Sequence, residues 1–243
     1  MEFVLRVLEE RGFIVVYSTV NLVYHRSFMD FDRDLTRGAH WSHYFCGPNL
    51  IAGADCPNCR KKLTLLVLLR TDDPYLHKLA PLAAQLPLLY CFRCALHEDL
   101  FYYRLSGASV DILRCAEGPE CPDQPYQGAP RQFAGCPAYL FELSQEAQDS
   151  IERINREEID SSDLPVHLKP LGYPAHQVGG KPLLSNTYHE TITCIGCGNT
   201  MQFLASIADE CLQPMGFTGD AGSQIMFHYC LACHIIAAFA QSD

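Results

Sequence analysis

The amino-acid sequence predicts an α+β protein that is mainly β, built from internally duplicated β units that each carry a four-cysteine site of the zinc-ribbon kind. Three observations lead to this fold class. Four Cys-x-x-Cys pairs occur, their spacing repeats along the chain, and short apolar runs stand beside each pair. Apolar runs of strand length are typical of buried β-strands, and paired Cys-x-x-Cys turns are typical of zinc sites.

The cysteine pairs fall into two sets with one layout. The first set is Cys56, Cys59, Cys91 and Cys94, and the second is Cys194, Cys197, Cys230 and Cys233. Between the pairs lie 31 residues in the first set and 32 in the second. Two tight turns that each aim two sulfurs at one ion complete a closed tetrahedron, so we expect two structural zinc ions. Cross-paired tetrads, and iron in place of zinc, also satisfy this pattern.

Apolar runs beside the cysteines predict four strands. Residues 85–90 and 224–229 each begin with Gln, end with Tyr and lead into a cysteine pair. Residues 63–69 and 201–207 follow the first pair of each set. All four runs fit buried strands. Upstream, residues 47–50 (GPNL) and 179–183 (GGKPL) predict turns that lead into a further strand.

The segments between these strands differ. Residues 71–84 contain Pro74 followed by spaced Leu and Ala residues, which predicts a short helix, whereas residues 217–222 predict a turn. Ser144 is a suitable N-cap for a helix that runs to about Ile159, with Ala147, Ile151 and Ile154 on one stripe.

These elements divide the chain into four segments. Residues 1–46 form an N-terminal segment, 47–105 the first zinc-binding β repeat, 106–171 a Pro/Gly-rich insert with a linker helix, and 172–243 the second zinc-binding β repeat. We expect one compact, pseudo-symmetric unit.

The sequence resembles two related groups of proteins at these motifs. Residues 176–182 (HQVGGKP) and 194–204 (CIGCGNTMQFL) resemble the YwqG-like family of bacterial proteins. The paired cysteine knuckles and the duplicated layout are similar to eukaryotic programmed cell death protein 2 and its ribosome-biogenesis relatives. The resemblance implies a mostly β, internally repeated fold, and for the eukaryotic relatives it implies zinc-dependent binding of a ribosomal protein.

A third ion is a further hypothesis. Cys115, Cys121 and Cys136 lie in or beside a Pro/Gly-rich stretch without strand or helix periodicity, which an ion could order. Cys46, His40 and His43 are the possible additional ligands. Free thiols in a loop explain these cysteines at least as well.

Composition and charge bear on location and partners. The start of the chain mixes Glu and Arg and lacks the basic and apolar regions of an export signal, so we expect a cytoplasmic protein. In a reducing compartment, metal binding explains a chain with 13 cysteines better than disulfides do. The net charge is −10, of which residues 123–243 contribute −9. This balance disfavours nucleic acid and favours a basic protein partner.

The sequence favours a structural zinc protein that acts as a protein-interaction or chaperone-like module, without enzymatic activity. Two alternatives stay open. One is a cysteine-dependent enzyme, either a dithiol oxidoreductase or a hydrolase, which requires a reactive thiol of low pKa. The other is an immunity protein that binds a co-encoded toxin, which fits a small acidic chain.

Overall fold

The computed structural model describes residues 12–17, 43–94, 100–115, 135–160, 176–184, 191–208 and 224–241. These residues form eleven strands, one α-helix and one short 3-10 helix. The strands are β1 (Gly12–Tyr17), β2 (His43–Phe45), β3 (Thr64–Arg70), β4 (Gln85–Tyr90), β5 (Phe101–Ser106), β6 (Ser109–Arg114), β7 (Cys136–Glu142), β8 (Gln177–Gly179), β9 (Gln202–Ala208), β10 (Gln224–Cys230) and β11 (Ile235–Gln241). The helices are α3 (Gln145–Asn155) and η2 (His77–Leu79). The predicted mainly β class is confirmed.

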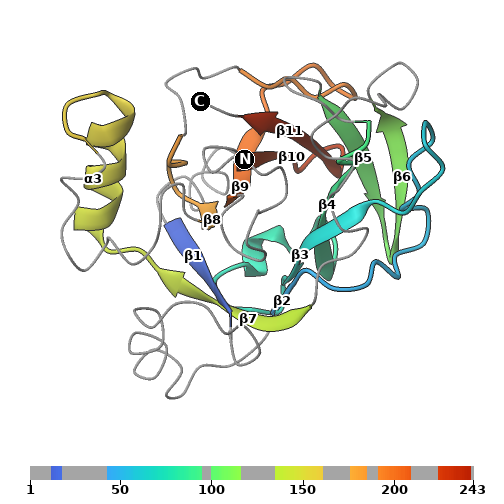
Figure 1. Ribbon diagram of the computed structural model, residues 1–243, viewed down its shortest axis with the longest axis horizontal. Helices are drawn as coiled ribbons and strands as arrows, with labels where there is room; N and C mark the ends of the chain where they lie inside the picture. The colour runs from blue at the N-terminus through green and yellow to red at the C-terminus, as the bar shows by residue number, and fades with distance from the viewer. Residues whose placement is uncertain are drawn as a thin grey trace.

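All eleven strands join one curved antiparallel sheet (Figure 1). Its order is β4-β3-β2-β7-β1-β8-β9-β10-β11-β5-β6. The pair β7–β1 lies between two similar three-strand sets, β2-β3-β4 and β8-β9-β10. We call the described residues before 116 the first half of the chain and those from 135 onward the second half.

The two long hairpins have the same register. In β3–β4, Thr64 lies opposite Tyr90, and in β9–β10, Gln202 lies opposite Tyr229. Each hairpin shifts register once, at Leu66 in β3 and at Leu204 in β9. Such a bulge bends the strand, so both hairpins curve at the same place.

The two halves exchange one strand each. Strand β1 of the first half pairs with β8 of the second, and β7 of the second half pairs with β2 of the first. The two exchanged strands also pair with each other. The centre of the sheet is therefore built from segments that are distant in the sequence.

One core is shared by both halves. It contains Leu66 and Leu88 from the first half and Leu204 and Phe227 from the second, all fully buried. Burying a side chain of this kind contributes roughly 1.5–3 kcal/mol to stability.

Tyr103 in β5 connects this core to the edge of the sheet. Its fully buried hydroxyl donates a hydrogen bond to the carbonyl of Pro87 (2.7 Å) and accepts one from the backbone N–H of Leu89 (3.3 Å). Strand β4 is an edge strand, where proline is tolerated because its missing N–H has no ladder partner to lose. The tyrosine therefore satisfies backbone groups that the sheet leaves unpaired.

Helix α3 forms where the sequence predicts it and ends about four residues earlier. The Ser144 hydroxyl accepts a hydrogen bond from the backbone N–H of Ala147 (3.2 Å), as an N-cap does. Ala147 and Ile151 are buried.

Among the described residues, no helix is long and apolar enough to cross a membrane.

The chain turns at residues 47–50 and 179–183 as expected, but in the described residues each turn follows a strand and does not lead into one. Strands β2 and β8 come before the Gly-Pro and Gly-Gly segments, and residues 46–63 hold only isolated bridges. Cys46 and Gly47 have φ of 56° and 96°, and Gly179 and Gly180 have φ of 65° and 67°. Two successive left-handed residues end a strand and redirect the chain. A three-residue strand is too short to give a periodic pattern.

The short helix expected within residues 71–84 is present only as the 3-10 helix η2. Apart from the three residues of η2, this segment is made of turns and irregular chain. Hydrogen bonds join its two ends. The N–H of Thr71 donates to the carbonyl of Ala84 (3.1 Å), and the hydroxyl of Thr71 donates to the carbonyl of Ala83 (2.8 Å). Local turn hydrogen bonds, such as that from the Tyr75 N–H to the Asp73 carboxylate (2.8 Å), compete with a longer helix. The turn expected at 217–222 lies outside the described residues.

Candidate metal centres

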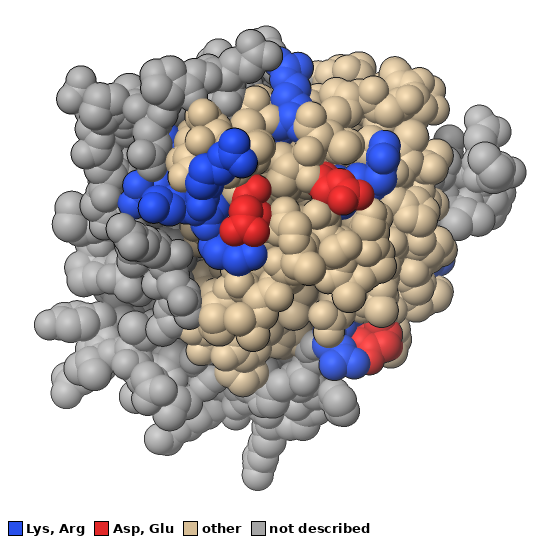
Figure 2. Space-filling model, turned by 90° about the vertical axis from the view of Figure 1, so that its right-hand side faces the viewer, with Lys and Arg blue, Asp and Glu red and all other residues tan. Residues whose placement is uncertain are grey.

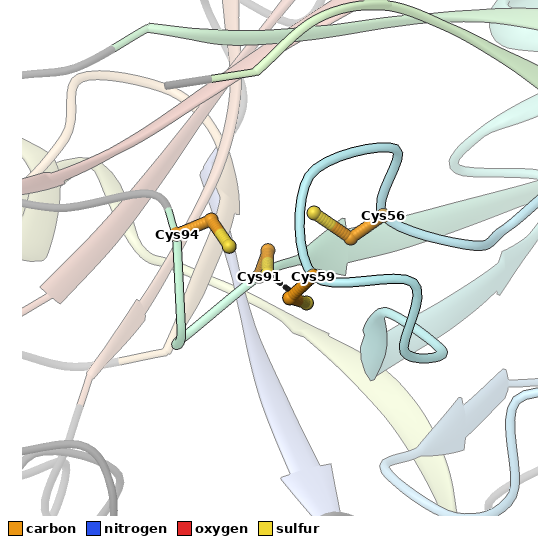
Figure 3. A group of neighbouring side chains, drawn as sticks. All are labelled: Cys56, Cys59, Cys91 and Cys94. Carbon is orange, nitrogen blue, oxygen red and sulfur yellow. Dashed lines mark hydrogen bonds between the residues drawn. The ribbon is translucent and has the colours of Figure 1, made fainter. Parts of the chain in front are cut away.

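The first candidate centre brings together Cys56, Cys59, Cys91 and Cys94, whose sulfurs all lie within 4.8 Å of one another. Two of them come from the loop before β3 and two follow β4, and their side chains turn toward a common space (Figure 3). The Cys59 and Cys91 sulfurs are 3.8 Å apart. The hairpin β3–β4 positions the site, because it places both turns at the same end of the sheet.

Backbone hydrogen bonds shape the first turn. The N–H of Arg60 donates to the carbonyl of Cys56 (2.9 Å), and the N–H of Cys56 donates to the carbonyl of Lys61 (2.8 Å). Arg60 has a φ of 59°, which lets the chain reverse directly after Cys59. The result is a tight loop with both sulfurs on its inner side.

The second candidate centre repeats this geometry with Cys194, Cys197, Cys230 and Cys233. The N–H of Gly198 donates to the carbonyl of Cys194 (2.8 Å), and the N–H of Cys194 donates to the carbonyl of Asn199 (2.8 Å). Gly198 has a φ of 72° and corresponds to Arg60. The Cys197 and Cys230 sulfurs are 3.7 Å apart.

The sulfur separations fit a zinc ion better than a disulfide. Four sulfurs at about 2.3 Å from zinc lie about 3.8 Å from one another in a tetrahedron, whereas a disulfide needs about 2.05 Å. The eight cysteines are free thiols in the structure. The structure groups them as the two sets expected from the spacing and not as cross-paired tetrads.

The pKa shifts in the first tetrad also favour a bound cation. A hydrogen bond from Cys91 lowers the pKa of Cys56 to about 5, and the same interaction, with burial, raises the pKa of Cys91. Burial and the negative charge of Cys56 raise the pKa of Cys94 to about 12. One thiolate thus hinders ionisation of its neighbours, and a divalent cation removes this conflict because it binds all four as thiolates.

The second tetrad behaves in the same manner. Burial raises the pKa of Cys230 to about 12, and a hydrogen bond from the backbone N–H of Asn199 lowers the pKa of Cys197. Both groups of four therefore fit Zn²⁺, with all coordination positions taken by the protein. A closed site of this kind fixes structure and leaves no position for a substrate.

The described residues do not form the ligand group expected for a third ion. Cys115 is half-buried beside the first tetrad, where burial and the Cys56 charge raise the pKa of its thiol. Cys46 is fully buried next to β2, and Cys136 begins β7. Among the described residues, only the two tetrads form a group of three or more ligands. Cys121 and His40 lie outside these residues.

His43 is engaged in hydrogen bonds rather than free for a metal. Its Nδ1 accepts from the backbone N–H of Arg70 (3.0 Å), which leaves the proton on Nε2, 3.0 Å from Asp73. His176 takes the corresponding place in the second half, where its Nδ1 accepts from the N–H of Ala208 (3.0 Å). Sequence reasoning missed this pair. The sequence feature that could have indicated the pair is a histidine three or four residues before each left-handed turn.

Buried His176 is expected to make the stability of the protein fall in acid. Burial lowers its pKa to about 3, so the folded protein binds this proton less readily than the unfolded chain. Its contribution is complete above the unfolded pKa near 6.5 and is lost as the pH falls toward 3. We expect roughly 2 kcal/mol of unfolding free energy to be lost between pH 6.5 and pH 5.

The variant His176→Asn tests this expectation in denaturant titrations, since the amide oxygen can still accept the Ala208 hydrogen bond. Its stability should depend less on pH than that of the wild type. Loss of zinc in acid affects both proteins and therefore cancels when their unfolding free energies are subtracted. His77→Asn at an exposed site is the control. Parallel pH curves for the wild type and His176→Asn would contradict the assignment.

A comparison with known proteins finds no match for this chain among family models, curated proteins or solved structures. The resemblances described from the sequence motifs therefore stay predictions. The functional argument depends on the two sites themselves.

Proposed function

We propose that this chain is a structural zinc protein that binds another protein, with one Zn²⁺ in each cysteine tetrad. The observation that carries the proposal is the pair of closed four-sulfur groups at equivalent ends of the two hairpins. Zinc at such a site stabilises the fold by on the order of 10 kcal/mol. The ions would hold two exposed loops in fixed shapes, which suits recognition of a partner.

We infer that the two halves arose by duplication. Support comes from the shared register of the hairpins, the equivalent bulges at Leu66 and Leu204, and the reciprocal exchange of β1 and β7. The matching roles of His43 and His176 add a correspondence outside the cysteines. The duplicated unit would then include β1 and β7, and so extend beyond the repeats expected from the sequence.

The proposed partner is a basic protein, because the net charge of −10 resides mainly in residues 123–243. Helix α3 is a weak candidate for its docking surface. Glu152 already pairs with Arg156 and Lys181, and Glu158 lies within 4.0 Å of Arg153 and Arg156. Carboxylates that are already paired with neighbouring Arg and Lys side chains attract a partner less.

An enzymatic role for the cysteines has less support. Cys46 is fully buried, and the raised pKa of Cys115 reduces its fraction of reactive thiolate. Of the other described cysteines, all but Cys136 at the start of β7 belong to the tetrads. These facts favour binding over catalysis.

Metal analysis and partner capture on one sample test the proposal. Protein purified without chelator should contain two equivalents of zinc, and capture from its native cell extract should recover a basic protein in a complex that weakens as salt rises. One ion or none would contradict the two-site assignment. Two equivalents of iron would show that the sites bind iron and not zinc. A captured partner whose binding ignores salt would contradict the electrostatic part.

A further inference from the structure

The two cysteine centres share a backbone geometry but differ in the charge around them. The first is surrounded by cations: Arg60, Lys61 and Lys62 follow Cys59 directly, and Arg93 stands between Cys91 and Cys94. Among the described sequence neighbours of these cysteines, the acidic one is Asp55, which pairs with Lys62 (2.9 Å). On the face that carries β6, the visible charged side chains are mainly Lys and Arg, and the remaining described surface is largely uncharged (Figure 2).

The second centre lacks cations at the matching positions. The nearest described cation across the sheet is Arg104 of β5, which lies opposite Ile235 in β11 and opposite Asp111 in β6. The positions that match the four cations of the first are occupied by Gly198, Asn199, Thr200 and Ala232. Thr193 takes the place of Asp55. Within two residues of the four cysteines of this centre, the sequence contains no Asp, Glu, Lys or Arg.

This difference leaves the second centre with negative charge. Zn²⁺ neutralises two of four thiolates, so each loaded centre carries a formal charge of minus two. At the first centre the neighbouring cations compensate it. At the second, the Gly196 N–H contact to the Cys194 sulfur (3.4 Å) supplies a dipole but no charge.

The second centre is also accessible. Cys197 is exposed, and Ile195 at the tip of the same loop exposes 46% of its surface. The matching position in the first centre holds Pro57. An exposed aliphatic side chain beside thiolates that lack the loop cations of the first centre offers an apolar contact and an anionic one to the same ligand.

We propose that the second cysteine centre is the docking surface for a basic protein segment, with the thiolate charge attracting Arg or Lys and Ile195 contacting an apolar side chain. This inference rests on the proposed function, since the charge requires zinc in the site. The cations of the first centre repel the same segment, so one chain offers one such surface. Attraction at one site and repulsion at its counterpart together give specificity.

The test uses the full zinc-loaded chain and a short fluorescent peptide of Arg, Gly and Leu, with a Glu-for-Arg peptide as the control ligand. Fluorescence anisotropy should show one bound basic peptide per chain, weakened by salt, and no binding of the acidic peptide. The double variant Asn199→Lys/Ala232→Arg copies Lys61 and Arg93 into the second centre and should lose about tenfold or more in affinity. Its zinc content and circular dichroism must match those of the wild type.

The matched variant Lys61→Asn/Arg93→Ala makes the converse change at the first centre. It should bind the peptide at least as tightly as the wild type. In protein loaded with ¹¹³Cd, the peptide should move the NMR resonance of the second centre only. Equal affinity of both double variants, or a shift at the first centre alone, would overturn the docking proposal. Failure to load two ions would instead refute the proposed function.

Discussion

The variant Cys59→Ser is expected to lower the zinc content from two equivalents to one and to reduce the unfolding free energy by several kcal/mol. The Cys59 sulfur lies 3.8 Å from that of Cys91 and is one of four that close the first centre. A serine hydroxyl is a poor zinc ligand, and the bound metal contributes on the order of 10 kcal/mol to the folding free energy. Elemental analysis and denaturant titration measure the two effects.

Cys115→Ser is the matched control, because Cys115 is half-buried beside the same centre but stands outside the tetrad. It should keep both ions and most of its stability. Equal loss of zinc in the two variants would contradict the ligand assignment. If Cys115→Ser alone lost an ion, Cys115 would replace Cys59 as the ligand.

The variant Gly53→Ala is expected to destabilise the fold by roughly 2–4 kcal/mol. Gly53 has a φ of 77°, and an added Cβ would lie 2.0 Å from the carbonyl oxygen of Val110 in β6. That strand cannot move away cheaply, because the N–H of Val110 donates to the carbonyl of Ala52 (2.9 Å). Thermal and denaturant unfolding measure the loss.

Gly107→Ala separates backbone strain from the steric clash. Gly107 also has a left-handed φ, of 63°, but an added Cβ meets nothing within 4 Å. Its cost should be the left-handed strain alone, about 1 kcal/mol. Similar losses in the two variants would mean that the loop carrying Gly53 does not pack against β6 as described.

The cysteine grouping and the long hairpins could be predicted because their patterns are local. Two residues between cysteines define a turn, and the apolar runs of β3, β4, β9 and β10 each fit one strand within one residue. Ser144 marked the start of α3 for the same reason, since a cap lies within three residues of the group it bonds.

The remaining fold depends on contacts that local patterns do not reveal. Strands β5 and β6 follow the first centre in the sequence, yet β5 pairs with β11 of the second half. The hydrogen bonds of His43 reach Arg70 and Asp73, some thirty residues away. The charge contrast between the centres could be read from the sequence, but only when the matching backbone geometry shows which positions to compare.

The exchange of β1 and β7 has a consequence for biosynthesis. On the ribosome, β1 emerges first but can meet β7 only after residue 142 and β8 only after residue 179. Closing loops of this length is slow, and it leaves the edges of β1 and β2 open during translation. Neither half can complete its sheet alone. We therefore expect the nascent chain to need protection until the second half has left the exit tunnel, and a fragment ending near residue 115 to aggregate.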